Sequence, residues 1–211
     1  MSAEGGLTIA VPRGALFKET LDLLDAIGID TSEVRSNDRK LLFRDVGIIT
    51  MRPSDVPTYV AAGAADIGVT GKDVLIEQAE REVYELLDLG YGKCTMVLAS
   101  VAGDDPMEEA RRRLGMMRIA TKYPKIAARH FAATGRQAEM VEVKGSVELA
   151  PLTGLVDGIV DLTATGTTLR ENGLVVREEI VVCTARLIAN PVAHKLKAAA
   201  IDELLERVRA A

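Results

Sequence analysis

Short apolar runs and stretches with helical spacing alternate along this chain. Residues 7–11 form an apolar run, and after residues 12–14 apolar side chains recur every three or four positions up to Gly28. The first pattern is typical of a buried strand and the second is typical of a helix. The same alternation predicts further strands at residues 41–43, 46–51, 66–70, 94–99, 118–121, 140–143, 158–160 and within 174–188. Repeated alternation of strands and helices predicts an α/β fold.

Capping residues indicate where several helices begin. We expect Ser54 to cap one helix, Ser146 to cap a short one, and Asn190 to cap the last. The last helix should be continuous and amphipathic, with an apolar stripe made of Leu196, Ile201, Leu204, Leu205 and Val208. Such a stripe serves core packing or, in part, a subunit interface, and core packing is the favoured interpretation.

A weak internal repetition bears on the number of domains. Gly-Ala-Ala-Asp at residues 63–66 precedes one strand and Gly-Leu-Val-Asp at residues 154–157 precedes another, each strand being followed by a loop and a helix. Two similarly built lobes would explain the repetition, and so would the general preference of helix-to-strand turns for these residues. We expect two lobes, with residues 1–92 and 178–211 in lobe I and residues 93–177 in lobe II.

Composition narrows the classes of partner. The chain has 211 residues and a net charge of −5, which argues against nucleic acid as the main partner. Its one basic run, at residues 111–113, follows Glu108 and Glu109 at helical spacing, so a salt-paired helix face is favoured. There is no apolar run of membrane-spanning length and no signal-like start, so we expect a cytoplasmic protein without membrane contact.

The cysteines and histidines give no metal signature. Cys94 and Cys183 lie in apolar, strand-like runs, which favours buried reduced thiols. Together with His130 and His194 they show no metal-ligand spacing. His130 lies beside the apolar face of its helix, where a packed or surface role is favoured over catalysis.

The strongest chemical signal is the segment Asp-Leu-Thr-Ala-Thr-Gly-Thr-Thr-Leu at residues 161–169, with four hydroxyls and one glycine. It is expected to join a strand end to a helix start, where backbone N–H groups and hydroxyls can converge on a phosphate monoester. Thr-rich turns also occur without a ligand, because Thr caps helices well. Arg13, at the end of the first strand, is either a second ligand-binding group or an exposed loop arginine.

Six ordered blocks together carry a family resemblance. They are the segment above and Arg-Lys-Leu at residues 39–41, Arg-Pro-Ser-Asp-Val-Pro-Thr-Tyr-Val at 52–60, Gly-Lys-Asp at 71–73, Ala-Thr-Lys-Tyr-Pro at 120–124 and Gly-Ser-Val-Glu at 145–148. With this order and spacing the chain resembles the ATP phosphoribosyltransferases, the first enzymes of histidine biosynthesis. The resemblance covers nearly the whole sequence.

The resemblance implies a two-lobed α/β fold of the type II periplasmic-binding-protein kind, with the active site in the cleft between the lobes. It implies transfer of a phosphoribosyl group from phosphoribosyl pyrophosphate to N1 of ATP, with release of pyrophosphate. It also implies the short form of the enzyme, a homodimer within a larger hetero-oligomer, which works with a separate regulatory subunit resembling a histidyl-tRNA synthetase. Histidine is then expected to bind only when that subunit is present.

The resemblance also assigns residues. The phosphoribosyl pyrophosphate site is expected at Asp161, Thr163, Ala164, Thr165, Gly166, Thr167 and Thr168. Arg39 and Lys40 match the catalytic basic pair that faces pyrophosphate and ATP. The expected ATP-binding residues are Arg13, Gly14, Arg52 and Lys72, and Lys122 and Glu148 are further candidates.

Two details qualify this assignment. The family often has a second basic residue where this chain has Ala15, which leaves the contact of Arg13 with the ATP phosphates open. Mg²⁺ is expected to be carried by substrate phosphates, with Asp161 the one protein group that we consider as a ligand.

Two other functions fit parts of the sequence. A salvage-type phosphoribosyltransferase has a similar phosphate loop, but that loop follows two adjacent acids, and here the pair is Val160-Asp161. A non-catalytic solute-binding protein with two lobes would be expected to be secreted. The basic pair at Arg39 and Lys40 also argues against it.

Overall fold

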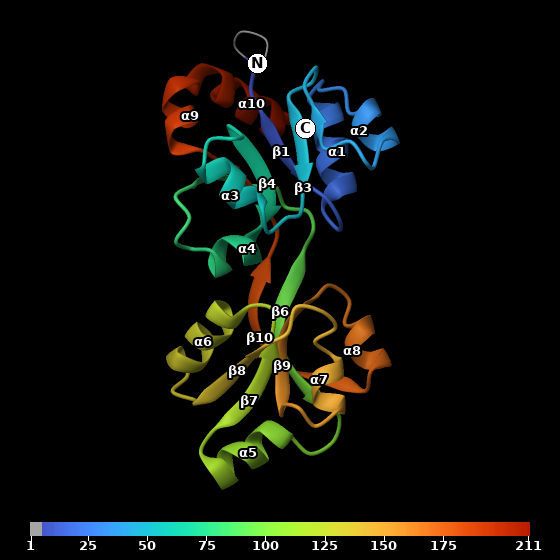
Figure 1. Ribbon diagram of the computed structural model, residues 1–211, viewed down its shortest axis with the longest axis vertical. Helices are drawn as coiled ribbons and strands as arrows, with labels where there is room; N and C mark the ends of the chain where they lie inside the picture. Colours follow the sequence, from blue (N-terminus) through green and yellow to red (C-terminus); the bar gives the residue numbers. More distant parts are fainter. Residues whose placement is uncertain (1–5) are drawn as a thin grey trace. The chain divides into compact units, whose positions relative to one another are not determined.

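The computed structural model describes residues 6–211, which form two compact units (Figure 1). Unit 1 comprises the chain up to Gly92 together with Thr184–Ala211, and unit 2 comprises Lys93–Cys183. The chain passes from unit 1 to unit 2 after Gly92 and returns after Cys183, later than the residue 178 expected for the start of the second part of lobe I. The later return has a simple cause, because residue 178 lies inside the strand β10 (Leu174–Cys183), which pairs with β6 (Cys94–Val101) along its whole length.

Unit 1 is built on a six-stranded sheet in the order β2-β3-β1-β4-β11-β5. Its strands are β1 (Ile9–Pro12), β2 (Leu42–Phe43), β3 (Ile48–Met51), β4 (Ile67–Gly71), β5 (Tyr84–Asp88) and β11 (Ala185–Ala189). Its helices are α1 (Phe17–Ala26), α2 (Ser32–Ser36), α3 (Val56–Ala61), α4 (Lys72–Glu77), α9 (Pro191–Leu196) and α10 (Ala198–Ala210). β1 is parallel to β3 and β4, whereas β2 is antiparallel to β3 and β11 is antiparallel to β4 and β5.

Both faces of this sheet are covered. Along β1, Ile9 and Val11 belong to the core under α1 and α10, while Ala10 packs on the opposite face with Val56 and Val60 of α3. Alternation of side chains along a strand produces exactly this division, because successive side chains point to opposite faces. Since β1 is buried on both sides, its sequence is continuously apolar.

Unit 2 has a five-stranded sheet in the order β10-β6-β9-β7-β8. The remaining strands are β7 (Met117–Thr121), β8 (Ala138–Glu142) and β9 (Gly158–Thr163), and the helices are α5 (Pro106–Leu114), α6 (Pro124–Ala133), α7 (Leu149–Leu152) and α8 (Thr167–Glu171). β7 is parallel to β8 and β9, and β6 is antiparallel to β9 and β10. Helix α6 covers one side of the sheet, and α7 and α8 cover the other (Figure 1).

The internal repetition corresponds to the same structural device in both units. Asp66 precedes β4 and accepts a 2.7 Å hydrogen bond from the backbone N–H of Thr8, just before the parallel strand β1. Asp157 precedes β9 and accepts a 2.7 Å hydrogen bond from the backbone N–H of Arg118 in the parallel strand β7. Each aspartate ties the start of one parallel strand to its neighbour, so β4 and β9 occupy equivalent places.

Several expected details are wrong. Ser54 does not cap α3, whose N-cap position is Asp55 without a side-chain hydrogen bond, and Ser146 does not cap α7, which begins after Glu148. Asn190 does cap the next helix, accepting from the N–H groups of Val192 and Ala193 at 2.9 Å.

The expected final helix is in fact two helices, separated at Lys197, where φ is −118° and ψ is 30°. The Lys197 ammonium lies 2.8 Å from the Asp66 carboxylate and holds the break in place. Ile201, Leu204 and Leu205 are buried in the core as favoured, but Leu196 is 78% exposed and does not belong to the stripe. Among residues 6–211, no helix is long and apolar enough to cross a membrane.

Candidate active site

The Thr-rich segment lies at the carboxyl end of β9 in unit 2. The strand extends to Thr163, further than expected, and α8 starts at Thr167 immediately after Gly166. Thr163 Oγ1 accepts a 2.8 Å hydrogen bond from the N–H of Gly166, and the hydroxyls of Thr165 and Thr167 lie 2.9 Å apart. These short contacts give residues 163–168, which we call the hydroxyl loop, a defined shape.

The helix dipole contributes little here. α8 has five residues, so the aligned peptide dipoles behind the loop are few. Hydroxyls and loop N–H groups must therefore provide the affinity for a phosphate. Thr165 and Thr168 are exposed and Gly166, with φ of 72°, adopts a left-handed conformation that L side chains rarely adopt.

The structure adds a residue that sequence reasoning missed, Arg170. Its guanidinium donates from Nη1 to the carbonyl of Thr165 at 2.9 Å and from Nη2 to Thr167 Oγ1 at 3.0 Å. Because the Thr167 oxygen accepts this bond, its own hydrogen is left to point elsewhere. The signal was present in the sequence, since an arginine three and five residues after two loop residues can fold back on them.

Asp161 lies in β9, two residues before the hydroxyl loop, and is 8% exposed. Its Oδ1 accepts from the N–H of Leu162 at 2.9 Å, and its Oδ2 lies 3.9 Å from the Lys122 ammonium. Burial raises the pKa of this carboxyl, and Lys122 and the Leu162 N–H act in the opposite direction, whereas Glu148 raises it further. The structure therefore brings the candidates Lys122 and Glu148 to the same carboxylate.

In unit 1, three predicted ATP-binding residues gather at one edge of the sheet. Arg13, Arg52 and Lys72 follow β1, β3 and β4 directly. These three strands are adjacent and parallel, so their carboxyl ends meet at a single edge, which is where ligands bind in open α/β sheets. The order of the strands thus unites residues that are far apart in sequence.

The basic pair reaches the same edge by a different route. Arg39 and Lys40 precede β2, which runs antiparallel to β3 with Leu42 opposite Ile49. The start of β2 therefore lies near the carboxyl end of β3. Asn37 Oδ1 accepts from the N–H groups of Arg39 and Lys40, at 3.3 and 3.0 Å, and closes this turn.

The side chains at this edge differ in how they are engaged. Arg39 and Arg52 are exposed. Lys40 is paired with Glu33 at 2.5 Å, and Lys72 with Glu85 at 2.6 Å. Gly14 is exposed, with φ of 87°. A phosphate would meet Arg39 and Arg52 directly, whereas it would have to compete with a carboxylate for each lysine.

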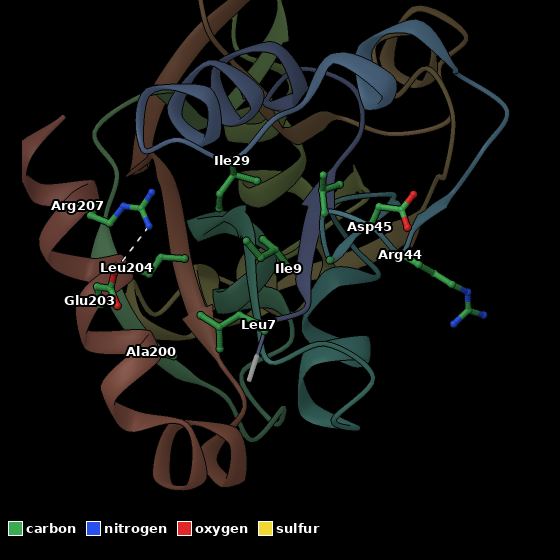
Figure 2. Close-up of a pocket in the computed structure, with 12 residues that line it drawn as sticks. Leu7, Ile9, Ile29, Arg44, Asp45, Ala200, Glu203, Leu204 and Arg207 are labelled. Carbon is green, nitrogen blue, oxygen red and sulfur yellow. Dashed lines mark ion pairs between the residues drawn. The ribbon is translucent and has the colours of Figure 1, made fainter. Parts of the chain in front are cut away.

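A separate cavity of about 290 Å³ in unit 1 lies elsewhere (Figure 2). Leu7, Ile9, Ile29 and Leu204 contribute apolar side chains to it, and Glu203 and Arg207 of α10 lie beside them. No residue of the predicted site lines it. The cavity is therefore distinct from the strand-end sites.

The candidate residues thus offer different polar groups in the two units, with hydroxyls and N–H groups in unit 2 and guanidinium and ammonium groups in unit 1. The two units, each built on one sheet, give the chain a two-lobed α/β fold. It is shared with the periplasmic aliphatic sulphonate binding protein SsuA of Escherichia coli, which is 12% identical, with a TM-score of 0.62 over 98% of this chain and 72% of that one. At that identity the likeness establishes the fold alone.

Closer relatives establish the family. The family model described as ATP phosphoribosyltransferase matches residues 52–210. The ATP phosphoribosyltransferase of Rubrobacter xylanophilus is 53% identical over 206 residues, covering 96% of this chain and 95% of the relative, and that of Bacillus licheniformis is 45% identical with 96% and 93% covered. A chain from the ATP phosphoribosyl transferase (HisG:HisZ) complex of Thermotoga maritima is 33% identical with a TM-score of 0.80, and 98% of this chain and 100% of that one are covered. The chain belongs to the ATP phosphoribosyltransferase family. Its activity is that of the family, which catalyses the first step of histidine biosynthesis.

Proposed function

We propose that the hydroxyl loop binds the 5-phosphate of phosphoribosyl pyrophosphate and that Arg39 and Lys40 act on the phosphates of the reacting pair. The observation that carries the proposal is the set of contacts within residues 163–170, which directs hydroxyls and N–H groups at one exposed turn. We further propose that Asp161, two residues before this loop, accepts hydrogen bonds from the ribose hydroxyls.

The reaction needs no side-chain nucleophile. N1 of the adenine already carries a lone pair, which forms a bond to C1 of the ribose as the bond from C1 to pyrophosphate breaks, and the electron pair of that bond leaves with pyrophosphate. Negative charge grows on the leaving group, so preorganised cations lower the barrier. Arg39 suits this role, because it is exposed at the sheet edge and its backbone is held by Asn37.

ATP is assigned to the same strand-end edge of unit 1. Arg52 is exposed there, and Lys72 would exchange its contact with Glu85 for a phosphate. Glu85 would not be left alone by this exchange, because Arg186 Nη1 lies 3.2 Å from it. The carboxylate thus keeps a partner when Lys72 turns to the substrate.

Magnesium fits this donor set only as a substrate-borne ion. Among residues 6–211 no group of three or more His, Cys, Asp or Glu side chains could hold a metal ion. Mg²⁺ binds readily through phosphates and one or two carboxylates, and Asp161 with nearby Glu148 supplies such carboxylates. When bound, the ion would neutralise pyrophosphate.

The Thermotoga maritima relative was solved as a HisG:HisZ complex, and we propose that this chain likewise works in the cytoplasm as a short-form catalytic subunit with a separate regulatory partner. Histidine should then bind only to the assembled complex. Calorimetric titration of histidine into the purified chain tests this, and saturable micromolar binding without a partner would contradict it.

The proposed site is tested with the purified chain, ATP, phosphoribosyl pyrophosphate and Mg²⁺, by following phosphoribosyl-ATP. Variants of the hydroxyl loop should raise the Michaelis constant for phosphoribosyl pyrophosphate and leave that for ATP nearly unchanged. Equal weakening of both substrates in a folded variant would contradict the assignment of this loop.

A further inference from the structure

Arg13, one of the predicted ATP-binding residues, uses its guanidinium in several contacts within unit 1. Its Nε donates to Thr50 Oγ1 at 3.0 Å, its Nη2 donates to the carbonyl of Lys40 at 3.0 Å, and its Nη1 lies 3.6 Å from Asp38. The guanidinium also stands over the ring of Phe17, 5.4 Å from its centroid. The side chain is 24% exposed.

Two of these contacts, those with Thr50 and Lys40, connect β3 to the segment that carries the basic pair, Arg39 and Lys40. The backbone N–H of Arg13 donates to Met51 at 2.7 Å, which places the residue beside the end of β3. Thr50, 3% exposed, donates its own N–H to the carbonyl of Leu41 at 2.8 Å. Arg13 and Thr50 therefore hold the consecutive carbonyls of Lys40 and Leu41 at the entry to β2.

The hydrogen bonds that hold the backbone near the basic pair also involve Arg13. Arg39 and Lys40 carry the cations, and their segment of backbone is held by Asn37 on one side and, through the carbonyls of Lys40 and Leu41, by Arg13 and Thr50 on the other. A guanidinium has a planar fork of donors that can bridge two acceptors at fixed angles, whereas an ammonium is a single point. The guanidinium of Arg13 bridges Thr50 and Lys40 in this way, and a lysine at this position would have no such fork.

We propose that Arg13 is a positioning residue, which fixes the backbone at Lys40 and so orients Arg39 and Lys40 toward the substrate phosphates, rather than a ligand of ATP. The inference rests on the proposed role of the basic pair. Misplacing a catalytic group by about 1 Å can cost about a hundredfold in rate, so a distant hydrogen bond is enough to control turnover.

The test compares Arg13→Lys and Thr50→Val with the parent, each alone and combined with Arg39→Ala. Arg13→Lys retains the charge but loses the fork, and Thr50→Val removes one acceptor while nearly keeping the shape. We expect Arg13→Lys to lower the turnover number about tenfold to a hundredfold, and Thr50→Val less, with the Michaelis constant for ATP changed by less than about twofold. In the Arg39→Ala background each change should lower turnover by a clearly smaller factor than in the parent, because only the effect exerted through Lys40 remains.

Hydrogen exchange gives a readout that does not depend on activity. The amides of Arg39 and Lys40 should exchange faster in Arg13→Lys, whether or not Arg39 is replaced by Ala. Should Arg13→Lys fail to fold, Thr50→Val alone carries the same comparison.

Three results would overturn the inference. One is a parental turnover number in Arg13→Lys, and another is a loss confined to the Michaelis constant for ATP, which a phosphate ligand would give. The third is full multiplication of the effects of Arg13→Lys and Arg39→Ala, which would show that the two residues act independently. If Arg39→Ala itself keeps the parental single-turnover rate, the proposed role of the basic pair fails and this inference fails with it.

Discussion

The hydroxyl loop of unit 2 and the basic segment of unit 1, which carries Arg39 and Lys40, are the two regions that we propose to bind phosphate, and they are shaped by opposite structural means. In the hydroxyl loop the shaping contacts span at most five residues, from the pair Thr165 and Thr167 to the bond between Arg170 and Thr165. The basic segment is instead held from a distance, because Arg13 is 27 residues from Lys40 and 37 from Thr50.

Because of this difference, substitutions should affect the two regions in different ways. A local loop keeps its shape as long as its own residues are intact, so substitutions in it should alter the affinity for one substrate. A segment held through strand pairing depends on the sheet, so substitutions at some distance should alter turnover. The predictions below test this contrast, from the largest expected effect to the smallest.

Arg39→Ala should lower the turnover number by roughly one to three decades at saturating substrates, because removal of one preorganised donor typically costs about 2.7 to 4 kcal/mol where water is excluded and less where solvent can take its place. Single-turnover rapid quench measures the chemical step without product release. Arg44→Ala is the control, since it removes an exposed arginine from the turn after β2. A parental chemical rate in Arg39→Ala would remove Arg39 from the mechanism.

Gly166→Ala should raise the Michaelis constant for phosphoribosyl pyrophosphate roughly tenfold, which corresponds to about 1.4 kcal/mol. The added Cβ would lie 3.0 Å from Arg170 Nη1 and displace the guanidinium that shapes the loop. Gly154→Ala is a matched control, because its φ of 71° is almost the same as the 72° of Gly166 but a Cβ there meets nothing within 4 Å. Both variants should lose similar stability, and only Gly166→Ala should lose affinity.

Thr168→Val should raise the same Michaelis constant by about two- to tenfold, the usual range for one lost hydrogen bond. Thr168 is exposed on the loop, so its hydroxyl is free to face the phosphate when the substrate binds. Thr134→Val provides a comparison, since that hydroxyl bonds to the carbonyl of His130 at 3.0 Å on α6. An equal effect of Thr168→Val on the Michaelis constant for ATP would count against local control.

Asp161→Asn should slightly raise the melting temperature near neutral pH while lowering activity. Burial raises the pKa of Asp161 above its ordinary value of 3.8, so the ionised form costs stability in the fold. That cost is fully present above the folded-state pKa and vanishes below the ordinary value, so the gain from Asn should shrink as pH falls through this window. Thermal melts of both proteins at a series of values from about pH 4 to 8 measure the difference in melting temperature. A variant less stable than the parent at neutral pH would show that the contacts of the carboxylate outweigh its burial.

Sequence reasoning succeeded where contacts are local. The position of the hydroxyl loop between a strand and a helix and the cap at Asn190 both follow from neighbouring residues. The α/β fold and the family were also confirmed. The strands expected at residues 41–43 and 46–51 were also confirmed as β2 and β3, and they pair as a hairpin because the turn between them is short.

It failed where tertiary contacts decide the outcome. Ser54 is a good cap in isolation, but its carbonyl accepts from Gln78 Nε2 at 2.8 Å and Pro53 accepts from Thr70, so this loop is fixed and the helix begins later. At the break, Lys197 contacts Asp66, which is 131 residues away, and no local pattern indicates this pairing. The hydrogen bond from Arg13 to the carbonyl of Lys40 likewise depends on the order of the strands, which no local sequence pattern contains.

The place of β11 between β4 and β5 has a consequence for the order in which the chain folds. Residues 93–183 form one continuous segment that holds every strand of its own sheet, whereas the sheet of unit 1 lacks its fifth strand in spatial order until residue 189 has been synthesised. On the ribosome, β5 has no neighbour to pair with before that moment. We therefore expect unit 2 to acquire protected amides first during synthesis, with β5 and β11 last, and pulse-labelled hydrogen exchange on stalled chains would reveal the order.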